Sequence, residues 1–106
     1  MEKLINKTIT KGSQDVTYTE LFEMNGKKLK LVIKSDSFDF QSYAKVMVLK
    51  QDEGWFNLCD IHYSAMNTPA QLYYKYNRDE KPSIEDEKYF VEDVKILKEL
   101  AKQLLD

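Results

Sequence analysis

The sequence predicts an α+β fold, an antiparallel β-meander of four to five strands with a long C-terminal amphipathic helix packed on one face. Alternating apolar and polar residues fill most of the first two thirds of the chain. An Asn-Gly dipeptide separates two of these runs, and apolar residues near the C-terminus recur at helical spacing. A length of 106 residues suits one domain, so we expect a single domain over residues 1–106.

The first three expected strands cover Leu4–Thr10, Val16–Met24 and Leu29–Lys34. Asn25-Gly26 predicts a two-residue type I′ turn, because both central residues of that turn need positive φ. A two-residue turn fixes the register and places Met24 opposite Lys27, with the further pairs following in order. The apolar side chains that then share one face are Tyr18, Phe22, Leu29, Leu31 and Ile33.

One acidic residue, Glu20, falls on this apolar face. We expect a carboxylate at the rim that points past the core, because an unpaired buried charge is costly. A functional role for Glu20 is the alternative.

A second hairpin is expected from Ser42–Lys50 and Trp55–His62, with Gln51-Asp52-Glu53-Gly54 as a four-residue loop. If Lys50 faces Trp55, both faces of this hairpin are apolar. One face collects Ala44, Val46, Val48, Cys59 and Ile61, and the other collects Tyr43, Met47, Leu49, Phe56 and Leu58. Strands of this kind are usually covered on both sides.

The C-terminal third reads as helical. Thr68-Pro69-Ala70-Gln71 resembles a capping box and favours a short helix through Tyr76, whereas the β-forming residues Leu72–Tyr76 favour a strand. The sequence therefore does not decide between a helix and a strand for residues 69–76. Ser83 caps a long helix over Ile84–Leu105, whose expected buried stripe is Phe90, Val94, Leu97, Ala101 and Leu104.

Few residues of the chain suit catalysis or metal binding. Cys59 and His62 are the only thiol and imidazole, which excludes an intrachain disulfide and most zinc sites. Three positions apart on a strand, they face opposite sides and make a poor catalytic dyad. Asp36 and Asp39 lack the spacing of a calcium loop. We therefore expect no enzymatic activity, no metal and no cofactor.

The N-terminus shows no signal-peptide pattern, and no apolar run is long enough to span a membrane. We expect a cytoplasmic protein without a membrane partner.

Two binding functions remain. The chain has more apolar residues on its expected strands than one helix can cover, which predicts a protein-binding surface. The partner would be a host protein or a second copy of the chain. The candidate residues are Tyr43, Met47, Leu49, Phe56, Leu58, Tyr73, Tyr74 and Tyr76. Basic and aromatic residues predict, as the weaker alternative, single-stranded nucleic-acid binding at Lys27, Lys28, Lys30, Lys34, Lys75 and Arg78. Arg78 is the only arginine, which disfavours reading of base edges.

The stretches Ile33–Val46, Gly54–Leu58 and Ile61–Met66 resemble small uncharacterised phage and prophage proteins. The lysine-rich, arginine-poor usage is similar to that of low-GC bacteria and their phages. Phage proteins of this size and fold type include inhibitors of host defence systems, anti-CRISPR proteins among them. The resemblance implies an inhibitor that occludes a host protein in the host cytosol, and it transfers no functional residue.

Overall fold

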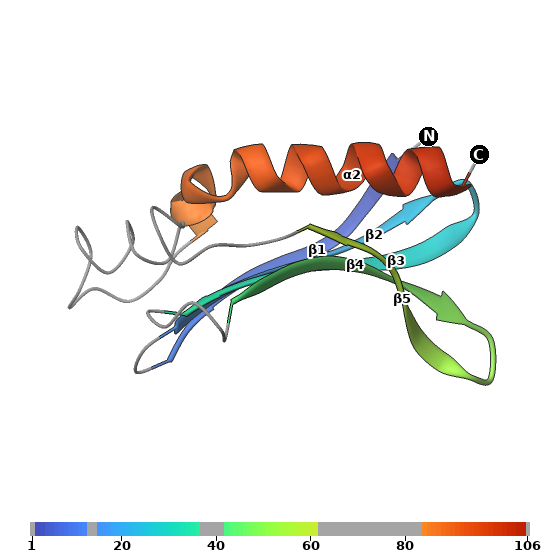
Figure 1. Ribbon diagram of the computed structural model, residues 1–106, viewed down its shortest axis with the longest axis horizontal. Helices are drawn as coiled ribbons and strands as arrows, with labels where there is room; N and C mark the ends of the chain where they lie inside the picture. Colours follow the sequence, from blue (N-terminus) through green and yellow to red (C-terminus); the bar gives the residue numbers. More distant parts are fainter. Residues whose placement is uncertain (1, 13–14, 37–41, 62–83, 106) are drawn as a thin grey trace.

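The computed structural model describes residues 2–12, 15–36, 42–61 and 84–105. Five strands form one antiparallel sheet in the order β1-β2-β3-β4-β5: β1 Glu2–Lys11, β2 Asp15–Met24, β3 Lys27–Asp36, β4 Tyr43–Lys50 and β5 Gly54–Ile61. A 3-10 helix, η2 (Ile84–Tyr89), leads into the helix α2 (Val91–Leu105), which lies across one face of the sheet (Figure 1). The predicted α+β fold is confirmed. In the described ranges, no helix could cross a membrane.

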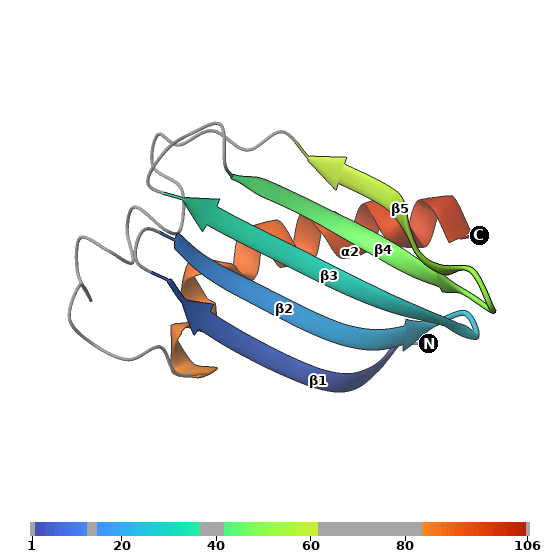
Figure 2. The ribbon, with the colours of Figure 1, turned by 90° about the horizontal axis from the view of Figure 1, so that it is seen from below.

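The β2–β3 hairpin has the predicted register. Met24 pairs with Lys27, Phe22 with Leu29 and Tyr18 with Ile33. The backbone at Asn25 and Gly26 has φ of 54° and 77°, the left-handed values that a type I′ turn requires. Figure 2 shows the five strands side by side, with β1 and β5 at the two edges.

The β4–β5 hairpin departs from the predicted register near its turn. Lys50 pairs with Gly54 and not with Trp55, so the loop is one residue shorter than expected. Leu58 has no partner in β4, because the register shifts between the pairs Val46–Cys59 and Met47–Asn57. This bulge restores the predicted pairing for the far half of the hairpin.

The shorter loop and the bulge together exchange the faces of several side chains. Trp55 pairs with Leu49, and Phe56 pairs with Val48 on the side that faces α2. Leu58 packs against the hydrophobic core and not beside Met47. The predicted grouping of Phe56 and Leu58 with Tyr43, Met47 and Leu49 is therefore wrong, because a one-residue shift moves a strand's side chains to the opposite face.

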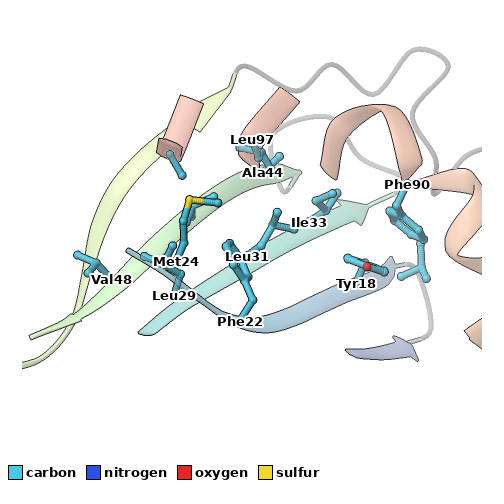
Figure 3. Close-up of a cluster of buried hydrophobic side chains, with 13 residues drawn as sticks. Tyr18, Phe22, Met24, Leu29, Leu31, Ile33, Ala44, Val48, Phe90 and Leu97 are labelled. Atoms are coloured by element: carbon cyan, nitrogen blue, oxygen red, sulfur yellow. The ribbon is translucent and has the colours of Figure 1, made fainter. Parts of the chain in front are cut away.

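The core lies between α2 and the sheet (Figure 3). Its fully buried members include Val16, Phe22, Leu29, Leu31, Ile33, Val46, Phe90, Leu97 and Ala101. Phe90 comes from the junction of η2 and α2, and its ring stacks on Tyr18 with 5.3 Å between centroids. Aromatic contacts of this kind add to the stabilisation from buried area alone.

The start of the C-terminal helix is tighter than predicted. Residues Ile84–Tyr89 are 3-10 helical, and the Phe90 N–H donates to the carbonyl of Glu87 at 2.8 Å. Regular α-helical bonding follows where the Val94 N–H donates to the Phe90 carbonyl. Leu104, a member of the predicted buried stripe, is 58% exposed, and Leu105 packs against the core instead. The i+4 step from Ala101 reaches Leu105, which explains the exchange.

The face of the sheet that points away from α2 is called the open face below. Its side chains from β2 to β4 alternate with the buried ones along each strand, and those of β5 are the partners of the β4 residues on this face. They are Asp15, Thr17, Thr19, Leu21, Glu23, Lys28, Lys30, Val32, Lys34, Tyr43, Lys45, Met47, Leu49, Trp55, Asn57 and Asp60. Among the described residues, no helix or strand covers this face (Figure 1).

Candidate functional site

Apolar side chains from neighbouring strands meet on the open face. Met47 of β4 lies between Lys30 of β3 and Asn57 of β5, and Leu49 pairs with Trp55. Tyr43 and Leu49 are 38% and 39% exposed, which is large for side chains of this size on a sheet. Val32 of β3 is only 7% exposed, so neighbouring side chains shield it even without a covering helix. Met47, Leu49 and Trp55 thus lie together toward the β4–β5 turn, whereas Tyr43 lies at the other end of β4.

Two lysines lie over aromatic rings of this face. The Nζ of Lys30 is 4.7 Å from the ring centroid of Trp55, and the Nζ of Lys45 is 4.7 Å from that of Tyr43. An ammonium over an aromatic face is attracted by the ring quadrupole, with about 0.5–1 kcal/mol at exposed sites. Each of these rings therefore has an ammonium group beside it in the structure.

Carboxylates accompany most lysines of the open face. Glu23 is the cross-strand partner of Lys28, and Asp60 is that of Lys45. The Nζ of Lys34 lies 3.8 Å from Oδ2 of Asp15. Cross-strand pairs of opposite charge are mildly stabilising, so these lysines already have electrostatic partners within the fold. The face is therefore amphipathic and not strongly basic.

The structure brings together only part of the predicted protein-binding set. Tyr43, Met47 and Leu49 lie on the open face, whereas Phe56 and Leu58 lie on the opposite side of the sheet. The three predicted tyrosines, Tyr73, Tyr74 and Tyr76, lie outside the described residues, as does the choice between helix and strand for residues 69–76.

Sequence reasoning missed Trp55 as a member of the open face. Gly54 has a φ of 93°, the backbone region that glycine adopts most readily. A glycine at the end of the loop is thus a signal that Gly54 itself closes the turn opposite Lys50, which moves Trp55 to the face of Leu49.

The predicted nucleic-acid-binding residues also do not all lie on one face of the sheet. Lys28, Lys30 and Lys34 lie on the open face. Lys27 is exposed beside the turn and pairs with Met24, a core residue, so it belongs to the other side of β3. Lys75 and Arg78 lie outside the described residues.

Glu20 is buried at 1% exposure beneath α2, so the expected position at the rim is wrong. The Tyr18 hydroxyl donates a hydrogen bond of 2.6 Å to Oε1 of Glu20, and Oε2 forms an ion pair with Lys98 of α2. Lys98 also bonds Glu2 of β1 at 2.5 Å. These partners make burial of the carboxylate tolerable, because a buried charge needs an opposite charge and hydrogen bonds.

A pocket of about 190 Å³ adjoins this cluster; it is lined by Lys7, Tyr18, Glu20, Glu87, Val91, Val94, Lys95 and Lys98. Several of its ionic groups neutralise one another, since Lys7 bonds Glu87 at 3.1 Å and Lys98 pairs with Glu20. Such an arrangement anchors α2 and η2 to the sheet.

The remaining reactive groups give no catalytic constellation within the described part of the chain. Burial raises the pKa of the Cys59 thiol, which lowers its thiolate fraction at neutral pH. His62 and Asp39 lie outside the described residues. Among the residues that the structure describes, no three His, Cys, Asp or Glu side chains are grouped to hold a metal ion.

Comparisons with family models, with curated proteins and with solved structures find no match to this chain. The choice of the open face as the candidate functional site therefore rests on its geometry.

Proposed function

We propose that this chain is a non-enzymatic binding protein that attaches to another protein through the open face of its sheet. The observation that carries the proposal is the exposure of large side chains on that face, where Tyr43 and Leu49, at opposite ends of β4, retain more than a third of their accessible surface. Tyrosine and tryptophan are frequent among the residues that dominate binding energy at protein interfaces. Tyr43 and Trp55 are the corresponding side chains here.

The charges of the open face favour a protein partner. Lys28, Lys34 and Lys45 each have a carboxylate beside or opposite them. Apolar and aromatic side chains with paired charges beside them are an ordinary composition for a protein interface. A nucleic-acid site needs unpaired cations that displace counterions from phosphates, and it gains less from lysines that are already neutralised.

The test compares two baits that exchange an exposed apolar residue for an acid. Tagged wild type, Tyr43→Asp on the open face and Leu104→Asp on α2 are incubated with lysate of the cells that encode the chain. We expect one protein to bind wild type and Leu104→Asp and to be lost from Tyr43→Asp. Circular dichroism checks that both variants are folded. Retention of every bound protein by Tyr43→Asp would contradict the proposal.

Single-stranded nucleic acid is the second candidate ligand. Aromatic rings beside lysines, as in Lys30 with Trp55 and Lys45 with Tyr43, are the elements of a base-stacking surface. The ammonium groups lie over the rings, so bases would have to displace them. Fluorescence anisotropy with labelled oligonucleotides at low salt tests this candidate; affinity that falls steeply with added salt supports it, and absence of binding removes it.

A more specific function, inhibition of a bacterial host defence protein by occlusion, rests on the resemblance of Ile33–Val46 and the neighbouring stretches to phage proteins. Its test needs the captured partner. Wild type should inhibit that protein's activity in proportion to binding, and Tyr43→Asp should not. Binding without inhibition would contradict an occluding role.

A further inference from the structure

The end of the β4–β5 hairpin, residues 49–56, exposes large apolar side chains on both of its faces. Leu49 belongs to the open face and Phe56 to the opposite face, and each is 39% exposed. The short loop produces this division, because it pairs Leu49 with Trp55 and Phe56 with Val48, and the bulge at Leu58 then compensates for it. A one-sided interface would use only one of them.

The core stops short of this hairpin end. Val48, the cross-strand partner of Phe56, is 9% exposed and belongs to the core. Figure 1 shows the turn of β4 and β5 bending away from α2, while the turn of β2 and β3 bends toward it. The hairpin end therefore projects from the two-layer body with both faces accessible.

The apex of the hairpin end is acidic and conformationally defined. Asp52 and Glu53 are both exposed there. The N–H of Glu53 donates to the Lys50 carbonyl at 3.1 Å, and Asp52 has a φ of 65°. Behind the apex, the Nζ of Lys50 lies 4.6 Å from the ring centroid of Phe56. The tip of the hairpin therefore carries two negative charges, and the apolar side chains and the Lys50 ammonium lie behind it.

We propose that the hairpin end inserts, apex first, into a cleft of the protein partner, with apolar walls that contact Leu49 and Phe56 and a basic floor that meets Asp52 and Glu53. Only a concave surface can cover apolar side chains on opposite faces of one ribbon at once. The basic floor follows from charge complementarity, since two carboxylates are costly to desolvate without cations. This inference rests on the proposed function and specifies the shape and charge of the partner.

Site-specific photocrosslinking tests the geometry while the partner is still unidentified. The probe is p-benzoylphenylalanine, placed in separate proteins at position 47, 49 or 56, with the exposed position 104 in α2 as the control. Insertion requires that positions 49 and 56 crosslink to the same polypeptide and that position 104 does not. Crosslinking from positions 47 and 49 but not 56 would overturn insertion and leave the proposed function standing. No crosslinking from any of the three would refute both.

Once crosslinking has identified the partner, affinity measurements with the purified partner test which side chains of the hairpin end contribute to binding. Leu49→Ser and Phe56→Ser should each weaken binding by about tenfold or more, as expected for buried anchors. Asp52→Asn with Glu53→Gln should weaken it and reduce its salt dependence, whereas Gln51→Ala, the matched apex control, should stay within about twofold. Unchanged affinity of Phe56→Ser, with unaltered thermal unfolding, would overturn the inference.

Discussion

At the scale of single residues, the most informative group is the carboxylate of Glu20. Its place on the apolar face follows from the hairpin register, which the Asn25-Gly26 turn determines. Its partners do not follow from that register alone, because Lys98 lies far along the chain and reaches Glu20 only after α2 packs on the sheet. Tyr18, by contrast, is two positions away on the same face and completes the buried cluster.

This cluster predicts a loss of stability at alkaline pH. Burial, and then the hydrogen bond to Glu20, raise the pKa of Tyr18 above its ordinary value of 10.0. Burial lowers the pKa of Lys98, but its bonds to Glu2 and Glu20 outweigh that effect and raise it above 10.5. The unfolded chain therefore loses both protons at lower pH than the native protein does. Stability is full below about pH 10 and declines as the pH rises further.

Urea unfolding between about pH 8 and about pH 11 measures this decline. Tyr18→Phe has no phenolic proton, so its free energy of unfolding should fall less steeply over the same interval. Equal slopes for wild type and Tyr18→Phe would show that Tyr18 does not contribute.

At the scale of elements, the ion pairs of Lys98 fasten α2 to β1 and β2. The helix contacts β3, β4 and β5, and Lys98 reaches β1 and β2 at the other edge of the same face through Glu2 and Glu20. The Nζ of Lys98 also lies 4.9 Å from the ring centroid of Phe22. Lys98 thus links α2 to the two strands that its apolar side chains contact least.

Removal of Lys98 should be costly for this reason. Lys98→Met leaves the Glu20 carboxylate buried without its cation, and we expect a loss of about 3–5 kcal/mol in the free energy of unfolding. Glu20→Gln combined with Lys98→Met should recover at least half of the loss, because no buried charge remains. Lys102→Met, an exposed lysine of the same helix, should change stability by no more than about 0.5 kcal/mol. Additive effects of the two single changes would contradict this account.

The second hairpin, β4–β5, differs from its predicted register near the turn. Its strands and the far half of its register follow from alternation. The shorter loop and the compensating bulge at Leu58 do not, because both arrangements satisfy the apolar pattern nearly equally when each face is apolar. Packing of Leu58 against the core is a favourable contact that the bulged register provides. Membership of Trp55 in the open face is a consequence of that choice.

At the scale of the whole molecule, the two edges of the sheet differ from its centre. No side chain of β1 is fully buried, whereas β2, β3 and β4 contribute most of the core. Local opening is easiest where few apolar contacts must be broken. The charged residues Lys3, Lys7 and Lys11 along β1 also suit an edge strand that avoids pairing with other chains.

Native-state hydrogen exchange should therefore be uneven. We expect the hydrogen-bonded amides that join β1 to β2 to exchange at least about tenfold faster than those that join β2 to β3, an opening free energy about 1.4 kcal/mol lower. Exchange followed by NMR at neutral pH resolves the two sets. Equal protection in β1 and β3 would show that the sheet opens only as one unit.

The amino-acid sequence by itself determined the α+β class, the strand order implied by short turns, the register of the first hairpin and the helical C-terminus, because these depend on alternation, turn residues and local spacing. Tertiary structure alone decided the pairing of Glu20 with Lys98, the bulge at Leu58 and the division of the apolar residues of β4 and β5 between two faces. Those features depend on contacts between distant segments, and competing arrangements differ in energy only once the helix and the sheet are packed together.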